Sequence, residues 1–248
     1  MSSSKIFGIN AIKNRLQLGG AGIEKVILRR GELSPRLKEI MDLATSLQCS
    51  VDRVEDDVLN GMTGVVHQGV GMMLAPLKMK SEADLFDIVA SVEGDLLLLV
   101  LDGVTDPRNL GACLRSAATL GVHAVVVPRD KSASLNDAAI KTASGGASYV
   151  PLVQVVNLAR CLNQLRKENV WVVGTQLEAE QSIADVDMSG NIAIVMGSEE
   201  KGLRQKTITC CDFLANIPML STNFGFNVSV AAGICLYEAN RQRTLAPD

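Results

Sequence analysis

From residue 94 onward, short apolar runs alternate with segments of helical periodicity. The runs DLLLLVLD, HAVVVP, WVVGT and IAIVMG contain few polar positions, which is typical of strands buried on both faces of a sheet. Helical spacing is found in NLGACLRSAATLG, LNDAAIKTASGGA, NLARCLNQLRKEN and VSVAAGICLYEANRQ. Repeated strand and helix units of this kind predict an α/β fold with a parallel sheet covered by helices.

Residues 1–75 have a mixed pattern that predicts a small separate α/β domain. Helical spacing in FGINAIKNRL and PRLKEIMDLATSLQ alternates with the strand-like segments KVILR and VVHQGVGMML. Residues 76–93 begin with a proline, and we expect a linker that runs into a short helix. Residues 94–248 would then form the larger domain.

Composition excludes several classes of protein. Of the 248 residues, 47% are hydrophobic and 21% are charged, so the chain can bury a core and is not expected to be disordered. No uncharged apolar run reaches about 18 residues, so we expect no membrane-spanning helix and no membrane partner. The N-terminal residues carry charges within their apolar run and do not resemble a signal peptide.

Cysteine and histidine usage argues against a metal centre and against a disulfide framework. Six cysteines are present without a CxxC pair, and only two histidines could assist them. A reducing, cytoplasmic location is therefore expected. His67 lies in the small domain and His123 lies beside a predicted strand, where a structural role is the simpler interpretation. A Ser-His-Asp triad, which needs a positioned histidine, is accordingly not expected.

The charge balance limits the way in which the chain could bind nucleic acid. Its formal net charge is −3, whereas a protein that coats RNA or DNA is normally basic. Any RNA contact would need a local patch, and basic residues gather in the first half of the larger domain at Arg108, Arg115, Arg129, Lys131 and Lys141. For each of these taken singly, a solvated surface position is the simpler interpretation.

Ligands of parallel α/β sheets bind at the carboxyl ends of the strands, and the first polar segment there is DGVTDPRNLGACLRSA, residues 102–117. Asn109 is predicted to cap the helix that follows. Arg115 lies in a stretch of small residues that should lean toward the core, where its charge would need an anionic partner. The alternative is a simple helix cap and a surface arginine.

Two further segments place polar residues after predicted strands. GSEEKGL, residues 197–203, holds Glu199 between two glycines, either as an ordinary turn or as a loop that passes close to a ligand. PMLSTNFGFNVSVAAGICLYE, residues 218–238, has a polar loop before a helix rich in alanine and glycine, with Asn227 as the expected N-cap. Neither a Walker A loop nor a GxGxxG fingerprint is present, which weighs against nucleoside triphosphates and against a nicotinamide oxidoreductase.

Together, NLGACLRSA, VMGSEEKGL and IP followed by FNVSVAAGICLYE resemble the three motifs of the SpoU (TrmH-like) family of RNA ribose 2′-O-methyltransferases, in the right order and spacing. FGINAI and GVVHQGVG are similar to the small substrate-binding domain of one subgroup, so the resemblance covers nearly the whole chain. The first motif and GVHAVVVP are most similar to bacterial members that methylate a guanosine in the peptidyl-transferase P loop of 23S rRNA.

This resemblance implies a fold, a cofactor and partners. The larger domain would have the SPOUT fold, whose parallel sheet ends in a deep trefoil knot, a rare exception to ordinary chain topology. It would bind S-adenosylmethionine as the methyl donor, without a metal, and act on 23S rRNA as a homodimer with the active site at the interface. The small domain would resemble RNA binders of the ribosomal-protein L30e type.

The resemblance also implies roles for single residues. The expected cofactor-binding residues are Gly197, Ile217 and Phe226, largely through their backbone groups. The expected polar active-site residues are Asn109, Arg115, Glu199 and Asn227. By hypothesis, Arg115 holds a phosphate beside the target ribose or stabilises its developing alkoxide, and Glu199 orients Arg115 or accepts the proton through water.

One position departs from the family pattern. The subgroup usually has Ser-Leu before the asparagine of the third motif, where this chain has Gly225 and Phe226. Ser229, or a loop hydroxyl such as Ser221, would have to replace the missing serine. Two alternative functions remain open at this stage: a tRNA ribose 2′-O-methyltransferase of the same family, and a non-catalytic RNA-binding ribosome-assembly factor.

Overall fold

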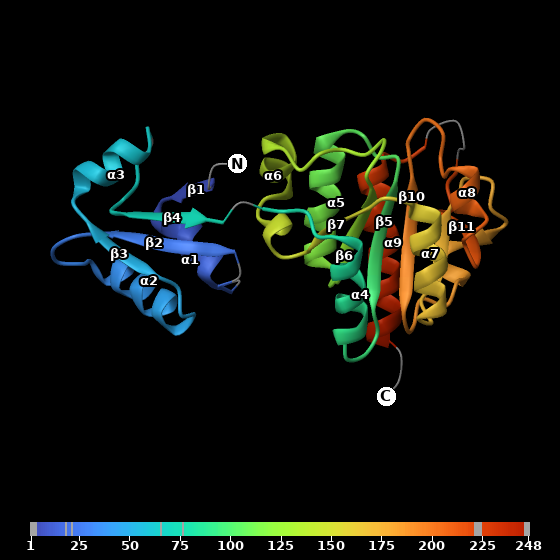
Figure 1. The fold of residues 1–248 in the computed structure, drawn as a ribbon, viewed down its shortest axis with the longest axis horizontal. Coiled ribbons are helices and arrows are strands. Elements are labelled where there is room, and N and C mark those ends of the chain that lie inside the picture. Colours follow the sequence, from blue (N-terminus) through green and yellow to red (C-terminus); the bar gives the residue numbers. More distant parts are fainter. Residues whose placement is uncertain are drawn as a thin grey trace. The chain divides into compact units, whose positions relative to one another are not determined.

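The protein was analysed as a computed structural model that describes residues 4–17, 19–20, 22–64, 66–75, 77–220 and 225–245. The chain forms two compact units, the first ending at Leu77 and the second beginning at Lys78 (Figure 1). Each unit has its own sheet. The two units are described separately below.

The first unit is a small α/β unit, as its mixed pattern predicted. Its sheet has the order β1-β4-β2-β3, in which β2 pairs parallel with β3 and antiparallel with β4. The strands are β1 (Ser4–Phe7), β2 (Ile23–Arg29), β3 (Val51–Val54) and β4 (Val70–Leu74). The helices are α1 (Ile9–Gln17), α2 (Pro35–Ser46) and α3 (Asp56–Met62). Ile12, Leu28 and Ile40 lie in one buried apolar cluster.

The second unit contains a seven-stranded sheet in the order β7-β6-β5-β10-β8-β11-β9, and every strand pair in it is parallel. This confirms the predicted α/β class. The strands are β5 (Leu97–Asp102), β6 (Ala124–Pro128), β7 (Leu152–Val155), β8 (Trp171–Thr175), β9 (Gln181–Ser182), β10 (Ile192–Gly197) and β11 (Phe213–Asn216).

Helices cover both faces of this sheet. They are α4 (Glu82–Ser91), α5 (Pro107–Thr119), α6 (Asp137–Ala143), α7 (Leu158–Lys167), α8 (Gln205–Ile208) and α9 (Val228–Leu245). Two short 3-10 turns, Gly146–Ser148 and Ile183–Asp185, complete the unit. Alternate residues of a strand face opposite sides, and in β5 Leu97 and Leu99 join the core of α5, α6 and α9. Leu98 and Val100 join the core of α4 and α7.

We expected residues 76–93 to form a linker leading into a short helix, but residues 78–93 lie within the second unit. The helix is present as α4, and its Leu85 is fully buried in the apolar cluster that also holds Leu98. Before α4, Lys80 bridges to Val153 at the edge of β7. Charged residues alternate with the apolar residues of this segment, which is why its sequence resembled a linker. The boundary between the two units falls between residues 77 and 78.

Gly111 lets α5 pack closely on α6, and this contact gives a first prediction. A Cβ atom at Gly111 would lie 2.4 Å from the carbonyl oxygen of Ala139 and 2.8 Å from Cβ of Thr142. We expect Gly111→Ala to lower the free energy of unfolding of the second unit by about 1–3 kcal/mol, because the helices must separate. Urea denaturation followed by circular dichroism measures the change.

Gly61 of α3 provides the matched control for Gly111. No described atom lies within 4 Å of a Cβ atom added there. The same change at Gly61 is therefore expected to raise the stability of the first unit by up to about 1 kcal/mol, because alanine favours helix over glycine. A stability for Gly111→Ala equal to or above wild type would contradict the packing argument.

Candidate active site

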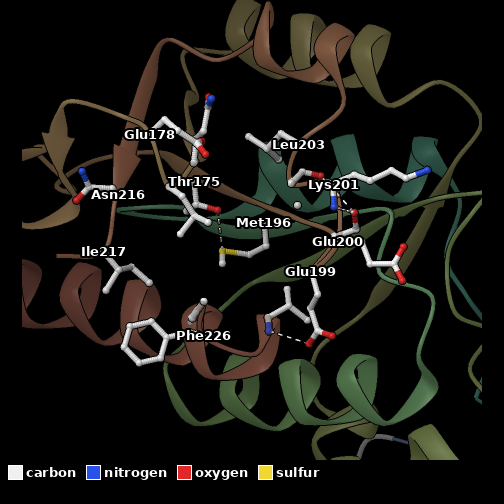
Figure 2. Close-up of a pocket in the computed structure, with 18 of the residues that line it drawn as sticks. Thr175, Glu178, Met196, Glu199, Glu200, Lys201, Leu203, Asn216, Ile217 and Phe226 are labelled. Atoms are coloured by element: carbon white, nitrogen blue, oxygen red, sulfur yellow. Dashed lines mark hydrogen bonds between the residues drawn. The ribbon is translucent and has the colours of Figure 1, made fainter. Parts of the chain in front are cut away.

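A cavity of about 480 Å³ opens at the carboxyl ends of β8, β10 and β11. Its walls come from the segments that follow these strands, Gln176–Glu178, Gly197–Leu203 and Ile217–Met219, and from the residues around the start of α9. This is the edge at which parallel α/β sheets bind ligands. We call this space the first cavity (Figure 2).

The first cavity brings together the three residues expected to bind a cofactor. Gly197, Ile217 and Phe226 all line it. Figure 2 shows Ile217 and Phe226 close together on one side, with Met196 and Leu203 across the space from them. Gly197 ends β10, where a Cβ atom would lie 2.2 Å from the backbone carbon of Gly202. Only glycine therefore allows the loop after β10 to fold back this closely.

The ionisable side chains around the first cavity are mainly acidic. Glu178, Glu199 and Glu200 line it, and Lys201 is the only basic residue among the described lining residues. In Figure 2, Glu200 and Lys201 extend away from Ile217 and Phe226, whereas Glu178 lies near Thr175. Such a cavity favours a ligand that combines a flat apolar part with positive charge.

A second cavity, of about 500 Å³, lies on the other side of the loop after β10. Residues 102–106, Asn109 and Lys131 line it together with residues 198–204. Ser198–Leu203 and Val228 line both cavities. We call residues 198–203 the dividing loop, because they form the common wall of the two cavities.

Glu199 of the dividing loop joins the polar residues predicted from the three motifs. Its Oε1 accepts hydrogen bonds from Asn109 Nδ2 at 3.1 Å, from the backbone N–H of Val228 at 3.2 Å and from Asn227 Nδ2. Asn227 Nδ2 also donates to Asn109 Oδ1 at 3.1 Å. We call Asn109, Glu199 and Asn227 the polar cluster. It joins α5, the dividing loop and the start of α9.

Within the described part of the chain, no hydrogen bond reaches Glu199 Oε2, and the side chain is exposed. Oε1 of Glu199 thus accepts from three donors of the protein, while Oε2 can accept a hydrogen bond from a ligand or from water. Ser229 fixes the side chain of Asn227. Its hydroxyl donates to Asn227 Oδ1 at 2.6 Å, and its backbone N–H donates to the same oxygen at 3.0 Å. Ser221, the other hydroxyl considered, lies outside the described residues.

The helix caps differ in part from the prediction. Asn227 precedes α9 and accepts from the N–H of Ser229, so the predicted N-cap is confirmed. Asn109 is not a cap, because α5 begins two residues earlier. Asp106 is its N-cap and accepts from the N–H of Arg108, followed by Pro107 in the first helical position, where proline is favoured. The side chain of Asn109 is therefore available to the polar cluster.

Arg115 is exposed, which corrects the expectation that its charge leans toward the core and is buried with an anion. Six residues after Asn109, it lies about 9 Å further along α5 and about 240° around it. No hydrogen bond or ion pair joins its guanidinium to Glu199 or to any other described residue. Within one chain, Glu199 therefore does not orient Arg115.

Histidine and cysteine take no part in this site. His123 Nδ1 accepts the N–H of Leu97 at 3.1 Å, which confirms its structural role. Burial raises the pKa of the Cys113 and Cys235 thiols to about 12, so both stay protonated at neutral pH and are poor nucleophiles. Among the described residues, no group of three or more His, Cys, Asp and Glu is placed to hold a metal ion, and no helix could span a bilayer.

Some lining residues were not identified from the sequence. Glu178 lies in a loop that carries no motif, and only its position after a predicted strand could have indicated it. Lys131, which lines the second cavity, was named only as one of several basic residues of a possible RNA patch. Asp102 and Arg204 were also missed as partners. Asp102 ends the first strand of the second unit, and an acidic residue directly after such an apolar run was the available signal.

Comparison with known proteins places this arrangement in a family. The model of the SpoU rRNA Methylase family matches residues 96–237, and the model described as RNA 2′-O ribose methyltransferase substrate binding matches residues 5–80. The chain therefore belongs to the SpoU rRNA methylase family.

Curated relatives match over nearly their whole length. The 23S rRNA (guanosine-2′-O-)-methyltransferase RlmB of Xylella fastidiosa strain 9a5c is 46% identical over 241 residues, which are 97% of each chain. The RlmB protein of Escherichia coli K12 is 44% identical over 243 residues, which are 98% of this chain and 100% of the relative. The similarity to both relatives therefore extends across both units of this chain.

Solved structures show the same fold. The SpoU methyltransferase AviRb from Streptomyces viridochromogenes in complex with AdoMet has a TM-score of 0.71 and 24% identity, covering 99% of this chain and 92% of its own. A structure described as an RNA 2′-O ribose methyltransferase has a TM-score of 0.65 and 26% identity, covering 98% and 90%. The second unit accordingly has the parallel sheet of a SpoU methyltransferase.

Proposed function

We propose that the protein transfers the methyl group of S-adenosylmethionine to the ribose 2′-oxygen of a guanosine in 23S rRNA, in the peptidyl-transferase P loop. The observation that carries this proposal is the polar cluster on a loop that separates two cavities. Glu199 lines both cavities, so one carboxylate can face a methyl donor on one side and a ribose on the other. The substrate follows from the relatives, which are named for 23S rRNA guanosine.

The first cavity fits S-adenosylmethionine. Its volume of about 480 Å³ lies within the range of about 300–1,000 Å³ for small-molecule sites. Met196, Leu203, Ile217 and Phe226 offer apolar walls for an adenine ring, and the carboxylates of Glu178 and Glu199 favour positive charge. When bound, S-adenosylmethionine supplies a methyl group that its sulfonium charge has already activated.

The residues of this chain would provide position and proton removal. Asn109 and Asn227 hold Oε1 of Glu199, so that Oε2 can accept the proton of the 2′-hydroxyl directly or through one water. General-base assistance of this kind contributes about 10²–10⁴-fold to a rate. The second cavity would hold the ribose, since Asn109 and Glu199 line it and Lys131 can contact a phosphate there.

The missing serine of the third motif leaves the cluster intact. Gly225 lines the first cavity, and Ser229 donates its hydroxyl proton to Asn227. We assign Ser229 to the positioning of Asn227, and no catalytic hydroxyl is needed in this scheme.

A homodimer would complete the site. Val230 and Tyr237 lie seven residues apart on one side of α9 and are 50% and 61% exposed. Such an apolar stripe favours burial against a second copy of the chain. Because Arg115 does not contact the polar cluster of its own chain, we infer that the second copy brings its Arg115 to this site. There, the guanidinium would bind the phosphate beside the target ribose or stabilise the developing alkoxide.

The resemblance also implies a threaded C-terminus, and we propose a trefoil knot from β10 to α9. In support, the first residue of α9, Val228, donates its backbone N–H to Glu199 of the dividing loop, and the last turn of α9 lies beside the start of β5. At that end, Arg243 donates to the carbonyl oxygens of Leu96 at 2.9 Å and Gly190 at 2.6 Å. We further propose that the first unit is an L30e-like RNA-binding domain, in line with its family model, and that the protein acts in the cytoplasm, where rRNA is modified.

Ribose-methylation mapping of total RNA from cells with and without the protein tests the substrate. We expect one guanosine mark in the P loop of 23S rRNA to be lost without the protein. Loss of a mark in tRNA alone would overturn the 23S assignment in favour of a tRNA enzyme. If every mark is retained and calorimetry detects no binding of S-adenosylmethionine, a non-catalytic assembly factor is the better account.

Gly197 gives a prediction for cofactor binding. Gly197→Ala forces the loop away from Gly202, because the added Cβ would lie 2.2 Å from its backbone. We expect the Kd for S-adenosylmethionine to rise by at least about tenfold, the effect of losing roughly 1.4 kcal/mol of binding energy. Isothermal titration calorimetry measures this Kd without RNA.

Gly225→Ala serves as the control for Gly197→Ala. Gly225 also lines the first cavity, but no described atom lies within 4 Å of an added Cβ atom. The Kd of Gly225→Ala for S-adenosylmethionine is expected to remain within about twofold of wild type. An unchanged Kd in Gly197→Ala would show that the close approach of the loop does not shape the cofactor site.

A further inference from the structure

The dividing loop is fixed at its base by backbone contacts within the second motif, and at its exit by Arg204, which lies outside the three motifs. Ser198 and Gly202 exchange two backbone hydrogen bonds, of 3.1 and 2.8 Å. Gly197 packs against Gly202 at the entrance of the loop. The exit of the loop is held differently, by the side chain of the residue that follows it, Arg204.

Arg204 forms an ion pair with Asp102, the last residue of β5, whose carboxylate is fully buried. Asp102 Oδ2 accepts the backbone N–H of Arg204 at 3.0 Å, and Oδ1 accepts from Nε and Nη2 of the same residue. The side chain of Asp102 is 0% exposed, and that of Arg204 is 42% exposed. Among the described residues, the hydrogen-bond and ion-pair partners of this carboxylate therefore all belong to Arg204.

Asp102 also stands opposite the entrance of the loop. It is in register with Gly197 across the β5 and β10 pair. Both ends of the dividing loop are thus tied to one residue, through the strand register at Gly197 and through the ion pair at Arg204. A shift of Arg204 would move the whole loop relative to β5, and with it Glu199.

Stability alone gives a poor account of such a pair. Burying the Asp102 carboxylate costs desolvation energy that offsets much of its attraction to the guanidinium, which is itself partly exposed to solvent. What a doubly hydrogen-bonded carboxylate does provide is one defined geometry, because the guanidinium is planar and its donors are fixed in direction. A geometric role fits a loop whose two faces line two cavities.

We propose that Asp102 and Arg204 are positioning residues for the reaction: their pair holds the dividing loop so that Glu199 meets Asn109 and Asn227 while the opposite face of the loop shapes the first cavity. This inference rests on the proposed function. Neither residue acts on the reacting atoms in this scheme, and both act through the position of the loop.

The chain contains a matched control pair, Asp212 and Arg166, at the amino ends of the strands of the same sheet, where Asp212 directly precedes β11. Asp212 accepts from Arg166 Nε at 2.8 Å with Oδ1 and from the backbone N–H of Val172 with Oδ2 at 2.9 Å. The side chain of Asp212 is 11% exposed and that of Arg166 is 41% exposed. The bonding pattern and burial resemble those of Asp102 and Arg204, but this pair is remote from both cavities.

The test compares Asp102→Asn and Arg204→Gln with Asp212→Asn and Arg166→Gln. We expect the first two variants to raise the Kd for S-adenosylmethionine and to lower kcat on rRNA, each by about tenfold, since displacements below 1 Å are costly at a reacting centre. The control variants are expected to lose similar thermal stability with Kd and kcat within about twofold of wild type. Parallel changes in both sets, or no change in the first, would overturn the proposal.

Two further measurements keep the test decisive if Asp102→Asn fails to fold. Arg204→Lys retains the charge but not the paired donors, and its kcat is expected to fall between those of wild type and Arg204→Gln. Hydrogen exchange of the Gly202 amide, which donates to Ser198, is expected to accelerate in the Arg204 variants and not in Arg166→Gln. Unchanged exchange together with unchanged Kd would exclude a positioning role.

The double variant Asp102→Asn/Arg204→Gln tests whether the two residues act as one unit. If they do, the kcat of the double variant is no lower than that of the less active single variant. Multiplied losses would show that each residue acts separately. Should the wild type itself neither bind S-adenosylmethionine nor methylate rRNA, the proposed function fails, while the exchange of the Gly202 amide still reports whether the pair holds the loop.

Discussion

Glutamine in place of Glu199 is expected to lower kcat on rRNA by about 10²–10⁴-fold, the range of general-base assistance. The amide oxygen of glutamine can replace Oε1 and accept from Asn109, Asn227 and Val228. Its amide nitrogen then replaces Oε2 and cannot accept a proton. The variant thus retains the polar cluster and loses only the proton acceptor. Single-turnover methylation of rRNA measures the effect.

Two companion measurements define this prediction. The Kd of Glu199→Gln for S-adenosylmethionine is expected to stay within about fivefold of wild type, because only one charge near the ligand is removed. Glu200→Gln is the control, since Glu200 is an exposed neighbour for which no hydrogen bond is found in the described structure. A kcat for Glu199→Gln close to that of wild type would remove Glu199 from proton transfer.

Alanine in place of Arg115 is expected to lower kcat by about 10²–10³-fold, the loss seen when one stabilising donor is removed from a reacting centre. Binding of S-adenosylmethionine is expected to be unaffected, because Arg115 does not line the first cavity. Arg160→Ala, which removes an exposed arginine of α7, is the control. Undiminished turnover in Arg115→Ala would exclude this residue from the reaction.

Mixing two inactive variants shows which chain supplies Arg115. A dimer that contains one Arg115→Ala chain and one Glu199→Gln chain would hold one intact site if Arg115 comes from the second copy. Equal mixing after dissociation then restores about a quarter of wild-type activity, since half of the dimers are mixed and each has one of two sites intact. No recovery from well-mixed chains would place Arg115 and Glu199 in the same subunit's site.

The central strands of the sheet in the second unit could be predicted because they are buried on both faces. All residues of β5 are buried, and β10 is buried up to its last residue, so their apolar runs had no competing interpretation. β3 was missed because each of its four residues is only partly buried and shows no alternation. α4 was found, but its packing in the second unit, where Leu85 is buried and Phe86 and Val89 contact the same apolar cluster, was not.

The site could be predicted in part, and its errors have local causes. The polar cluster was found because Asn109, Glu199 and Asn227 each lie in a recognisable motif, and Asn109 and Glu199 also follow the buried strands β5 and β10. Asn109 was taken for a cap, whereas Asp106 and Pro107, which lie just before it, form the helix start in the structure. Arg115 was expected to be buried because its neighbours are small, yet the small residues face α6 and α9 while the arginine faces outward.

The common wall of the two cavities constrains how any inhibitor could act. A compound that displaces residues 198–203 from one side alters the space available on the other, so occupancy of the two spaces must be thermodynamically linked. Linkage is reciprocal: whatever the methyl donor does to the affinity for RNA, RNA does equally to the affinity for the donor. A compound that occupies one cavity and displaces the loop therefore also changes the affinity for the ligand of the other cavity.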